Sequence, residues 1–296
     1  MQRIVECVPN FSEGRRKDVI DQIVASIREV AGVRVLDVES DADHNRSVLT
    51  FIGEPEAVEE AAFRSIRRAA ELIDMEQHRG GHPRMGATDV VPFVPIRGVT
   101  MNDCVQMARR VGARVGNELG IPVYLYEAAA TRPDRVNLAN VRRGEYEGLR
   151  REIATDPQRA PDFGPRKMGR AGATAIGARP PLIAFNVYLT TNDVRIAQAI
   201  AKAVRYSSGG LRYVKALGLL VEGRAQVSMN LTDYRKTPIA RVVEMIRAEA
   251  ARYGVGIATS EIIGLVPQEA LLDAAVHYLQ LHRFSAGQVL ENRLEG

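Results

Sequence analysis

The spacing of hydrophobic residues predicts one alternating series of strands and helices in the first hundred residues. Short runs rich in β-branched residues indicate strands, and apolar residues three and four apart indicate helices. The expected elements are a strand over residues 3–8, a helix over 16–30, strands over 33–38 and 47–52, a helix over 57–73 and a strand over 89–95. This βαββαβ order is typical of a ferredoxin-like unit, in which two helices cover one face of a four-stranded antiparallel sheet.

The same order is expected again in the second half of the chain. Its predicted elements are a strand over 182–189, a helix over 193–204, strands over 214–221 and 225–231, a helix over 238–253 and a strand over 257–266. Between the halves we expect a helix over 102–119, a strand over 122–126 and a helix over 143–153. A last helix is expected over 268–281.

The predicted fold class is therefore α/β (α+β), with two ferredoxin-like βαββαβ subdomains whose helices lie on one face of mainly antiparallel sheets. A chain of 296 residues is long enough for two such cores. We expect an N-terminal subdomain over 1–179, in which 155–179 form a linker loop, and a C-terminal subdomain over 180–296. The linker is predicted because 155–180 hold four prolines and four glycines.

Composition excludes several classes of protein. Hydrophobic residues make up 46% and charged residues 26%, as in folded globular proteins. No apolar stretch approaches the roughly 20 residues of a membrane span, and the N-terminus lacks the features of a secretory signal, so we expect a cytoplasmic protein with no membrane partner. Cys7 and Cys104 are too few for a disulfide framework. The net charge of +4 favours an anionic ligand without identifying one.

Three polar, glycine-containing segments interrupt the regular pattern, and such departures are where functional sites are expected. The first, residues 8–15, follows the first strand and places Asn10, Ser12 and Glu13 at the start of a helix, where a ligand can meet backbone amides. The third, residues 163–179, carries Arg166, Lys167 and Arg170 before a run of small residues. A plain helix cap and a flexible linker are the structural alternatives for these two segments.

His82 lies in the second segment, residues 80–89, and is the strongest candidate for a catalytic residue. The preceding glycines allow close approach of a substrate, the following proline favours an extended backbone, and imidazole exchanges protons near neutral pH. A structural role is the alternative for any loop histidine. His44, His78, His277 and His282 are weaker candidates.

The spacing of residues offers no metal site, no nucleotide site and no serine hydrolase site. The histidines are scattered, the glycine run lacks the G-K-[ST] ending of a phosphate-binding loop, and no G-x-S-x-G motif is present. We therefore expect neither a metal nor a nucleotide.

Six sequence blocks together resemble the glutamate formiminotransferase family. The blocks are VECVPNFSEGR at 5–15, HPRMGA at 82–87, GAR at 177–179, IAFN at 183–186, QVSMNL at 226–231 and IGLVP at 263–267. The resemblance covers nearly the whole chain. It implies two α/β subdomains with a substrate tunnel between them, a homodimer, tetrahydrofolate as cosubstrate and a catalytic histidine, which is His82 here. It also implies a single-function form, in which another protein supplies the cyclodeaminase.

The resemblance also suggests the other site residues. The family often has an aspartate where this chain has Glu39, with Asp37 two residues earlier, and we expect one of these to hold the tautomer of His82. Arg46, Arg84 and Arg179 are expected to bind substrate carboxylates, because guanidinium groups pair well with them. Expected pterin partners are Asn10, Asn186, Gln226 and Asn230. Further expected substrate contacts are Ser12, Glu13, Asp37, Met85, Gly86, Phe163, Gly164, Gly172, Ala173, Thr174 and Gly177, the family's folate contacts falling in the loop that matches 163–172.

Two alternative functions stay open. Transfer of a formyl group from 5-formyltetrahydrofolate to glutamate would use nearly the same residues. RNA binding by the two sheets belongs to a different class, and the 5% aromatic content with no tryptophan argues against it.

Overall fold

The computed structural model describes residues 3–294, which form two compact units, one up to Pro180 and one from Pro181 onward. Each unit has its own hydrophobic core. Within the described residues, no helix is both long and apolar enough to span a bilayer. Both cysteines are buried and unbridged. The two units are considered separately below.

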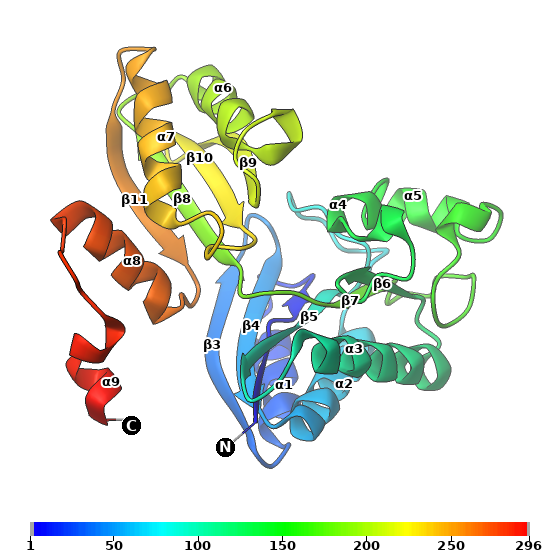
Figure 1. The fold of residues 1–296 in the computed structure, drawn as a ribbon. Helices are drawn as coiled ribbons and strands as arrows, with labels where there is room; N and C mark the ends of the chain where they lie inside the picture. Colours follow the sequence, from blue (N-terminus) through cyan, green and yellow to red (C-terminus); the bar gives the residue numbers. More distant parts are fainter. Residues whose placement is uncertain (1–2, 295–296) are drawn as a thin grey trace. The chain divides into compact units, whose positions relative to one another are not determined.

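The first unit is built on one mixed sheet (Figure 1). Its elements are β1 (Ile4–Cys7), β2 (Asn10–Phe11), α1 (Lys17–Arg28), β3 (Val33–Asp41), β4 (Arg46–Gly53), α2 (Pro55–Leu72), β5 (Thr88–Arg97), α3 (Met101–Arg114), β6 (Val123–Glu127), α4 (Leu138–Val141), α5 (Glu145–Glu152) and β7 (Thr174–Ala178). The successive strands β1 and β2 both lie between β4 and β5, and β3 pairs with the outer side of β4. These pairs are antiparallel, and their elements follow the predicted βαββαβ order.

Helices α1, α2 and α3 pack against this sheet through apolar faces. In α1 the buried residues are Val19, Ile20, Ile23, Val24 and Ile27, which have the spacing of one helical face. A capping box begins α3, because the Thr100 hydroxyl accepts from the Asp103 N–H while the Asp103 carboxylate accepts from the Thr100 N–H. After Arg114 the helix continues as one π-helical turn, Val115–Leu119, and ends at Gly120.

The predicted linker loop over 155–179 is wrong at its end, where residues form the buried strand β7. This strand runs parallel to β5 on one side and to β6 on the other, so the sheet extends beyond the predicted four antiparallel strands. Every residue of β7 is buried. Its sequence, TAIGA, has one β-branched aliphatic residue, so the composition predicted a loop. The small residues are instead explained by the close approach of neighbouring groups.

Gly177 shows how close that packing is. A Cβ at this position would lie 2.5 Å from the Tyr126 carbonyl oxygen and 2.6 Å from its ring. We expect Gly177→Ala to lower the free energy of unfolding by about 1–3 kcal/mol through overpacking. Gly148→Ala is the matched control, because a Cβ there meets nothing within 4 Å, and a helical Gly→Ala change should stabilise by roughly 0.5–1 kcal/mol. Urea unfolding of both variants tests this, and equal midpoints would contradict it.

The second unit contains a separate four-stranded antiparallel sheet. Its elements are β8 (Ile183–Leu189), α6 (Val194–Val204), β9 (Val214–Val221), β10 (Arg224–Leu231), α7 (Ile239–Ala251), β11 (Ile257–Ile263), α8 (Gln268–Leu279) and α9 (Leu290–Leu294). The strand order is β11-β8-β10-β9, so the first strand in sequence lies between the fourth and the third. The first unit repeats this order with β5, β1, β4 and β3. Helices α6 and α7 lie against one face (Figure 1).

Strand β8 shows which residues the second sheet leaves away from its helices. Ile183, Phe185, Val187 and Leu189 are buried in the core, whereas the alternating residues are only half buried. Because successive strand residues point to opposite faces, Asn186 and Tyr188 lie on the face that α6 and α7 do not cover. The predicted polar residues of β8 and β10 therefore share one face of this sheet.

Candidate functional site

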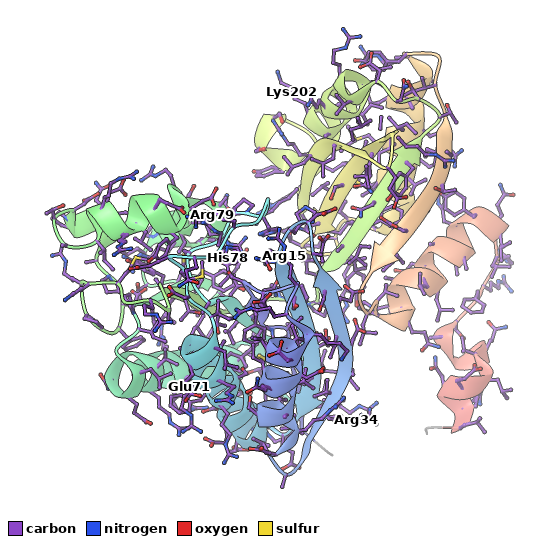
Figure 2. All side chains as sticks on the ribbon, turned by 180° about the vertical axis from the view of Figure 1, so that it is seen from behind. Arg15, Arg34, Glu71, His78, Arg79 and Lys202 are labelled. Carbon is purple, nitrogen blue, oxygen red and sulfur yellow. The ribbon has the colours of Figure 1, made fainter. Side chains whose placement is uncertain are left out.

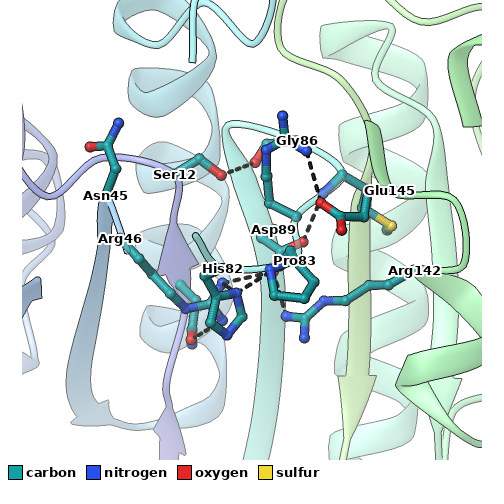
Figure 3. A network of polar contacts seen from close by, with 12 residues as sticks. Ser12, Asn45, Arg46, His82, Pro83, Gly86, Asp89, Arg142 and Glu145 are labelled. Atoms are coloured by element: carbon teal, nitrogen blue, oxygen red, sulfur yellow. Dashed lines mark hydrogen bonds and ion pairs between the residues drawn. The ribbon is translucent and has the colours of Figure 1, made fainter. Parts of the chain in front are cut away.

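Four residues from separate segments converge on one polar centre in the first unit (Figure 3). Arg46 is the first residue of β4, and His82 lies in the loop between α2 and β5. Asp89 is the second residue of β5, and Arg142 follows directly after α4. The centre is thus assembled from residues up to 96 positions apart in the sequence.

The turn before β4 places Arg46 at this centre. Asn45 adopts a left-handed backbone conformation with φ of 49°, which asparagine tolerates better than most residues. Its side-chain oxygen accepts from the Gly14 N–H at 2.9 Å, and its amide donates to the Arg79 carbonyl at 3.0 Å. Asn45 therefore ties the β3–β4 turn to the first polar segment and to the residue directly before the second. Figure 2 shows His78 and Arg79 at the opposite end of this unit from Arg34.

The contacts of His82 determine which ring nitrogen is free. Nδ1 lies 2.7 Å from the Pro83 carbonyl oxygen and 3.1 Å from Nη1 of Arg46. A carbonyl oxygen can only accept and a guanidinium N–H can only donate, so Nδ1 cannot form a hydrogen bond with both. The shorter contact, to Pro83, places the hydrogen on Nδ1 and the lone pair on Nε2, and the Arg46 contact is then not a hydrogen bond. The acceptor at Nδ1 is thus the Pro83 carbonyl rather than the carboxylate of Glu39 or Asp37 that the sequence predicted. Nε2 is the nitrogen that can take a proton from a substrate.

The surroundings of His82 keep its ring neutral. Burial, followed by the guanidinium groups of Arg46 and Arg142, lowers the pKa of His82 from 6.5 to about 4. At neutral pH the imidazole is therefore uncharged and has a free lone pair, although it is a weak base. A nearby anion would weaken the opposing field of the two arginines and raise this pKa.

This pKa can be measured directly by NMR titration of the His82 ring. We expect its resonances to stay unchanged between pH 8 and pH 5.5 and to titrate near pH 4, with His82→Gln providing the assignment. The unfolded chain takes up this proton near pH 6.5 and the native protein only near 4, so the stability that neutral His82 contributes is complete above pH 6.5 and declines as the pH falls toward 4. A midpoint near 6.5 in the native protein would contradict the described environment.

Asp89 holds the two arginines together. Its side chain is completely buried, and its Oδ2 accepts from Nη1 of Arg46 at 2.9 Å and from Nη2 of Arg142. Its Oδ1 accepts from the Met85 N–H at 3.1 Å. Burial alone would raise the pKa of Asp89, but the guanidinium groups of Arg142 and Arg46 hold it below its usual value. Two positive groups on one carboxylate leave this cluster with a net charge of about +1 at neutral pH.

The other contacts of Arg46 keep it in place. Nη2 of Arg46 donates to the side-chain oxygen of Asn10, so this predicted residue does belong to the centre. Burial, with repulsion from Arg142, lowers the pKa of Arg46 from 12.5 to about 10, which leaves it protonated at neutral pH. Its side chain is 12% exposed. A buried cation of this kind favours an anionic partner.

Arg84 faces partners other than a substrate. Its guanidinium forms ion pairs with Glu145 at 2.9 Å and with Glu147 at 2.6 Å, and its Nε donates to Nδ1 of His78. The pKa of Arg84 is raised, first by the hydrogen bonds that it donates to Glu147. Arg84 therefore fixes the His82 loop to α5, and its guanidinium is already neutralised. These contacts indicate a positioning role for Arg84, and its expected binding of a substrate carboxylate stays a prediction.

Ser12 and Glu13 also have structural partners. The Ser12 hydroxyl donates to the Gly86 carbonyl at 2.7 Å, which joins the first and second polar segments. The buried carboxylate of Glu13 accepts from the backbone N–H groups of Arg15 and Arg16 and from the Arg16 side chain. Burial would raise the pKa of Glu13, but these hydrogen bonds lower it. This carboxylate therefore satisfies free N–H groups just before α1.

Most predicted residues of the second and third polar segments pack against neighbouring backbone. Met85, Gly172, Ala173, Thr174 and Gly177 are buried. Ala173 donates its N–H to the Met85 carbonyl at 2.9 Å, and a Cβ at Gly86 would lie 2.0 Å from the Ala173 carbonyl oxygen. Phe163 packs over Gly112 of α3 and Gly116 of the π-helical turn, and Gly164 has a φ of 82° beside the Ile121 carbonyl. The described contacts of these residues are therefore packing contacts. Their expected contacts with the substrate stay predictions.

The remaining predicted residues of the first unit lie elsewhere on its sheet. Arg179 follows β7 directly, and its Nη1 donates to the Pro180 carbonyl at 3.1 Å. The positive charge of Arg179 acts on the buried groups of Glu6 and Tyr126. A bulge after Val35 brings Asp37 opposite Thr50 and Glu39 opposite Val48. Substrate contacts at Arg179 and Asp37 and the catalytic role of Glu39 stay predictions.

In the second unit, two predicted residues meet at one carboxylate. Oε1 of Glu261 accepts from the Asn186 amide at 3.0 Å, from the Tyr188 hydroxyl at 3.0 Å and from the Gln226 amide at 3.4 Å. Asn230 is exposed on β10 and does not share this group. Sequence reasoning missed Glu261, which occurs in an ordinary strand pattern. The pterin contacts of Asn186, Gln226 and Asn230 stay predictions.

The fold and this centre define an α/β protein of two units that holds a neutral imidazole beside a buried cationic cluster. Such a centre suits group transfer between substrates that carry carboxylates. In residues 3–294 no three His, Cys, Asp or Glu side chains are grouped to hold a metal ion.

Comparison with known proteins gives the family. The family model "Formiminotransferase domain, N-terminal subdomain" matches residues 4–179, and the model "Formiminotransferase domain" matches residues 184–292. The chain belongs to the formiminotransferase family, as the sequence blocks predicted. It is 51% identical to the glutamate formimidoyltransferase of Streptococcus pyogenes, covering 100% of both chains, and 53% identical to that of Thermoplasma acidophilum, covering 99% of this chain and 97% of the relative.

A longer relative shows what this chain does not span. The formimidoyltransferase-cyclodeaminase of Rattus norvegicus is 45% identical over 94% of this chain, which covers 53% of that protein. The chain therefore matches the Streptococcus pyogenes and Thermoplasma acidophilum proteins over nearly their whole length, and the Rattus norvegicus protein over about half of its length.

Proposed function

We propose that the protein transfers the formimino group between 5-formiminotetrahydrofolate and L-glutamate, with His82 as general base and general acid. The family membership and the two full-length relatives named as glutamate formimidoyltransferases support the reaction. The observation that carries the role of His82 is its geometry, in which Nδ1–H is held by the Pro83 carbonyl and Nε2 is left as the proton acceptor.

The chemistry fits a weakly basic imidazole. The neutral amine of glutamate attacks the formimino carbon, and its nitrogen becomes strongly acidic as the C–N bond forms. Nε2 of His82 can take that proton even with a pKa of about 4. The same proton then passes to N5 of tetrahydrofolate as the bond between N5 and the formimino carbon breaks. His82 ends the cycle as it began, so no further proton donor is needed.

An assay with two donors tests the proposal and its nearest alternative. Purified protein is given glutamate with either 5-formiminotetrahydrofolate or 5-formyltetrahydrofolate, and release of tetrahydrofolate is followed. We expect turnover with the formimino donor. Preference for the formyl donor would favour the alternative transferase, and turnover with neither would overturn the proposal. RNA binding has no support from the family.

The molecular setting of the reaction is also part of the proposal. Tetrahydrofolate serves as the cosubstrate, and a folate that carries additional glutamates would suit the net charge of +4. We propose no metal and no nucleotide in the reaction. Cytoplasmic localisation, a homodimer and the substrate tunnel stay predictions from the sequence.

A further inference from the structure

The arginine pair at Asp89 suggests where glutamate binds. Arg46 donates to two side chains, Asp89 through Nη1 and Asn10 through Nη2. Arg142 is different. Its Nη2 donates to Asp89, but its buried Nε–H has no acceptor among the described residues. A buried N–H without an acceptor costs about as much as a lost hydrogen bond and calls for an explanation.

The charge of the cluster explains what is missing. Two guanidinium groups share one carboxylate, so one positive charge in a site with side chains 12% and 15% exposed is not balanced by Asp89. A second carboxylate would balance that charge and accept from the vacant Nε–H. Arginine binds carboxylates well because its N–H groups form a rigid fork.

Geometry selects among the carboxylates of the two substrates. In glutamate the α-carboxylate is attached to the same carbon as the amine that must meet Nε2 of His82, whereas the γ-carboxylate carbon is three bonds from that carbon. Arg142 and Arg46 share one oxygen of Asp89, and Arg46 lies 3.1 Å from the His82 ring. A carboxylate at this pair would therefore lie close to the imidazole, as the α-carboxylate must when the amine meets that ring.

We propose that Arg142 binds the α-carboxylate of glutamate, and that Asp89 is the positioning residue that holds Arg142 and Arg46 beside His82. This inference rests on the proposed function. It assigns the role expected for Arg84 to Arg142. It also couples substrate binding to catalysis, because the bound carboxylate offsets the arginine charge that keeps a proton off His82 until glutamate is present.

Direct binding measurements test the assignment without requiring turnover. Dissociation constants of three ligands are measured by calorimetry with tetrahydrofolate bound: glutamate, 2-aminobutanoate, which lacks the γ-carboxylate, and 4-aminobutanoate, which lacks the α-carboxylate. Truncating one partner of a buried charge pair costs on the order of 30-fold or more in affinity. We expect Arg142→Met to weaken glutamate and 2-aminobutanoate by at least this factor and to change 4-aminobutanoate by less than about 3-fold.

Two controls separate this role from a structural one. Arg143→Met removes the same charge from the exposed neighbouring residue and should bind all three ligands like the unchanged protein. In the unchanged protein, adding glutamate should move the His82 NMR titration upward, and Arg142→Met should abolish this movement. An equal loss for all three ligands, or unchanged glutamate binding in Arg142→Met, overturns the assignment. Absence of formimino turnover with normal glutamate binding would instead overturn the proposed function.

Discussion

Replacing His82 with alanine is expected to lower kcat by about 10²- to 10⁴-fold, the usual contribution of a general acid and base. In the proposed mechanism Nε2 is the proton acceptor, because the Pro83 carbonyl accepts from Nδ1–H. Without the ring, the attacking nitrogen must lose its proton to water, and N5 of folate must leave without a positioned donor. The KM values should change much less than kcat, because the arginine cluster is intact. Steady-state assays with both substrates varied give this comparison.

A matched histidine variant and a rescue experiment make the test specific. His277→Ala, an exposed residue on α8, should retain near-normal turnover. The melting temperature and folate binding of His82→Ala should stay close to those of the unchanged protein. Added imidazole should restore part of the lost turnover if the ring acts as a base. Near-normal kcat in His82→Ala would remove this residue from the mechanism.

The fold was predictable where buried hydrophobic residues recur at the regular spacing of a helix or a strand. Helix α1 has five buried residues on one face, and β8 alternates buried and half-buried residues throughout, so both occur close to their predicted positions. Strand β7 was missed because its packing against Tyr126 demands glycine and alanine, which local sequence reasoning assigns to loops. The parallel part of the sheet could not be predicted without β7, since both parallel pairings involve this strand.

The candidate site was predictable only near His82. A glycine pair before a His-Pro sequence marks an unusual loop, and Asn10 and Arg46 adjoin predicted strands, so these residues were found. Arg142 is 53 residues from Asp89 in sequence, and only the folded chain brings them into contact. Arg84 was chosen because it is close in sequence to His82, and the sequence could not show that its side chain pairs with Glu145 and Glu147.

Asp89→Asn is expected to reduce both stability and catalysis. It removes the negative charge that offsets the repulsion between the guanidinium groups of Arg46 and Arg142. Breaking a buried ion pair from one side costs about 3–5 kcal/mol of unfolding free energy. Asparagine keeps the size of the side chain and can still accept from the Met85 N–H, so the loss reports the charge. Arg142 and Arg46 should then move apart, and kcat/KM for glutamate should fall by roughly 10²-fold or more, as for other misplaced substrate anchors.

The pH dependence of this contribution has a definite sign. The pKa of Asp89 is lowered in the native protein, so its stabilising effect is complete above the unfolded pKa near 4 and is lost as the pH falls through the lower native value. Urea unfolding at pH 7 and at pH 3 should therefore show a smaller difference between Asp89→Asn and the unchanged protein at the lower pH. Equal stability of the two proteins at pH 7 would contradict the assigned ion pairs.

A second substitution distinguishes charge repulsion from a general packing defect in Asp89→Asn. Adding Arg142→Met removes one of the two repelling cations, so the double variant should be more stable than Asp89→Asn alone. Residues that interact directly show coupling energies of about 0.5–3 kcal/mol in such cycles. The double variant should nevertheless bind glutamate poorly, because the α-carboxylate has lost its proposed partner. Recovery of stability without recovery of glutamate binding would show that Asp89 holds the arginines for the substrate, whereas additive losses in stability would assign it to packing alone.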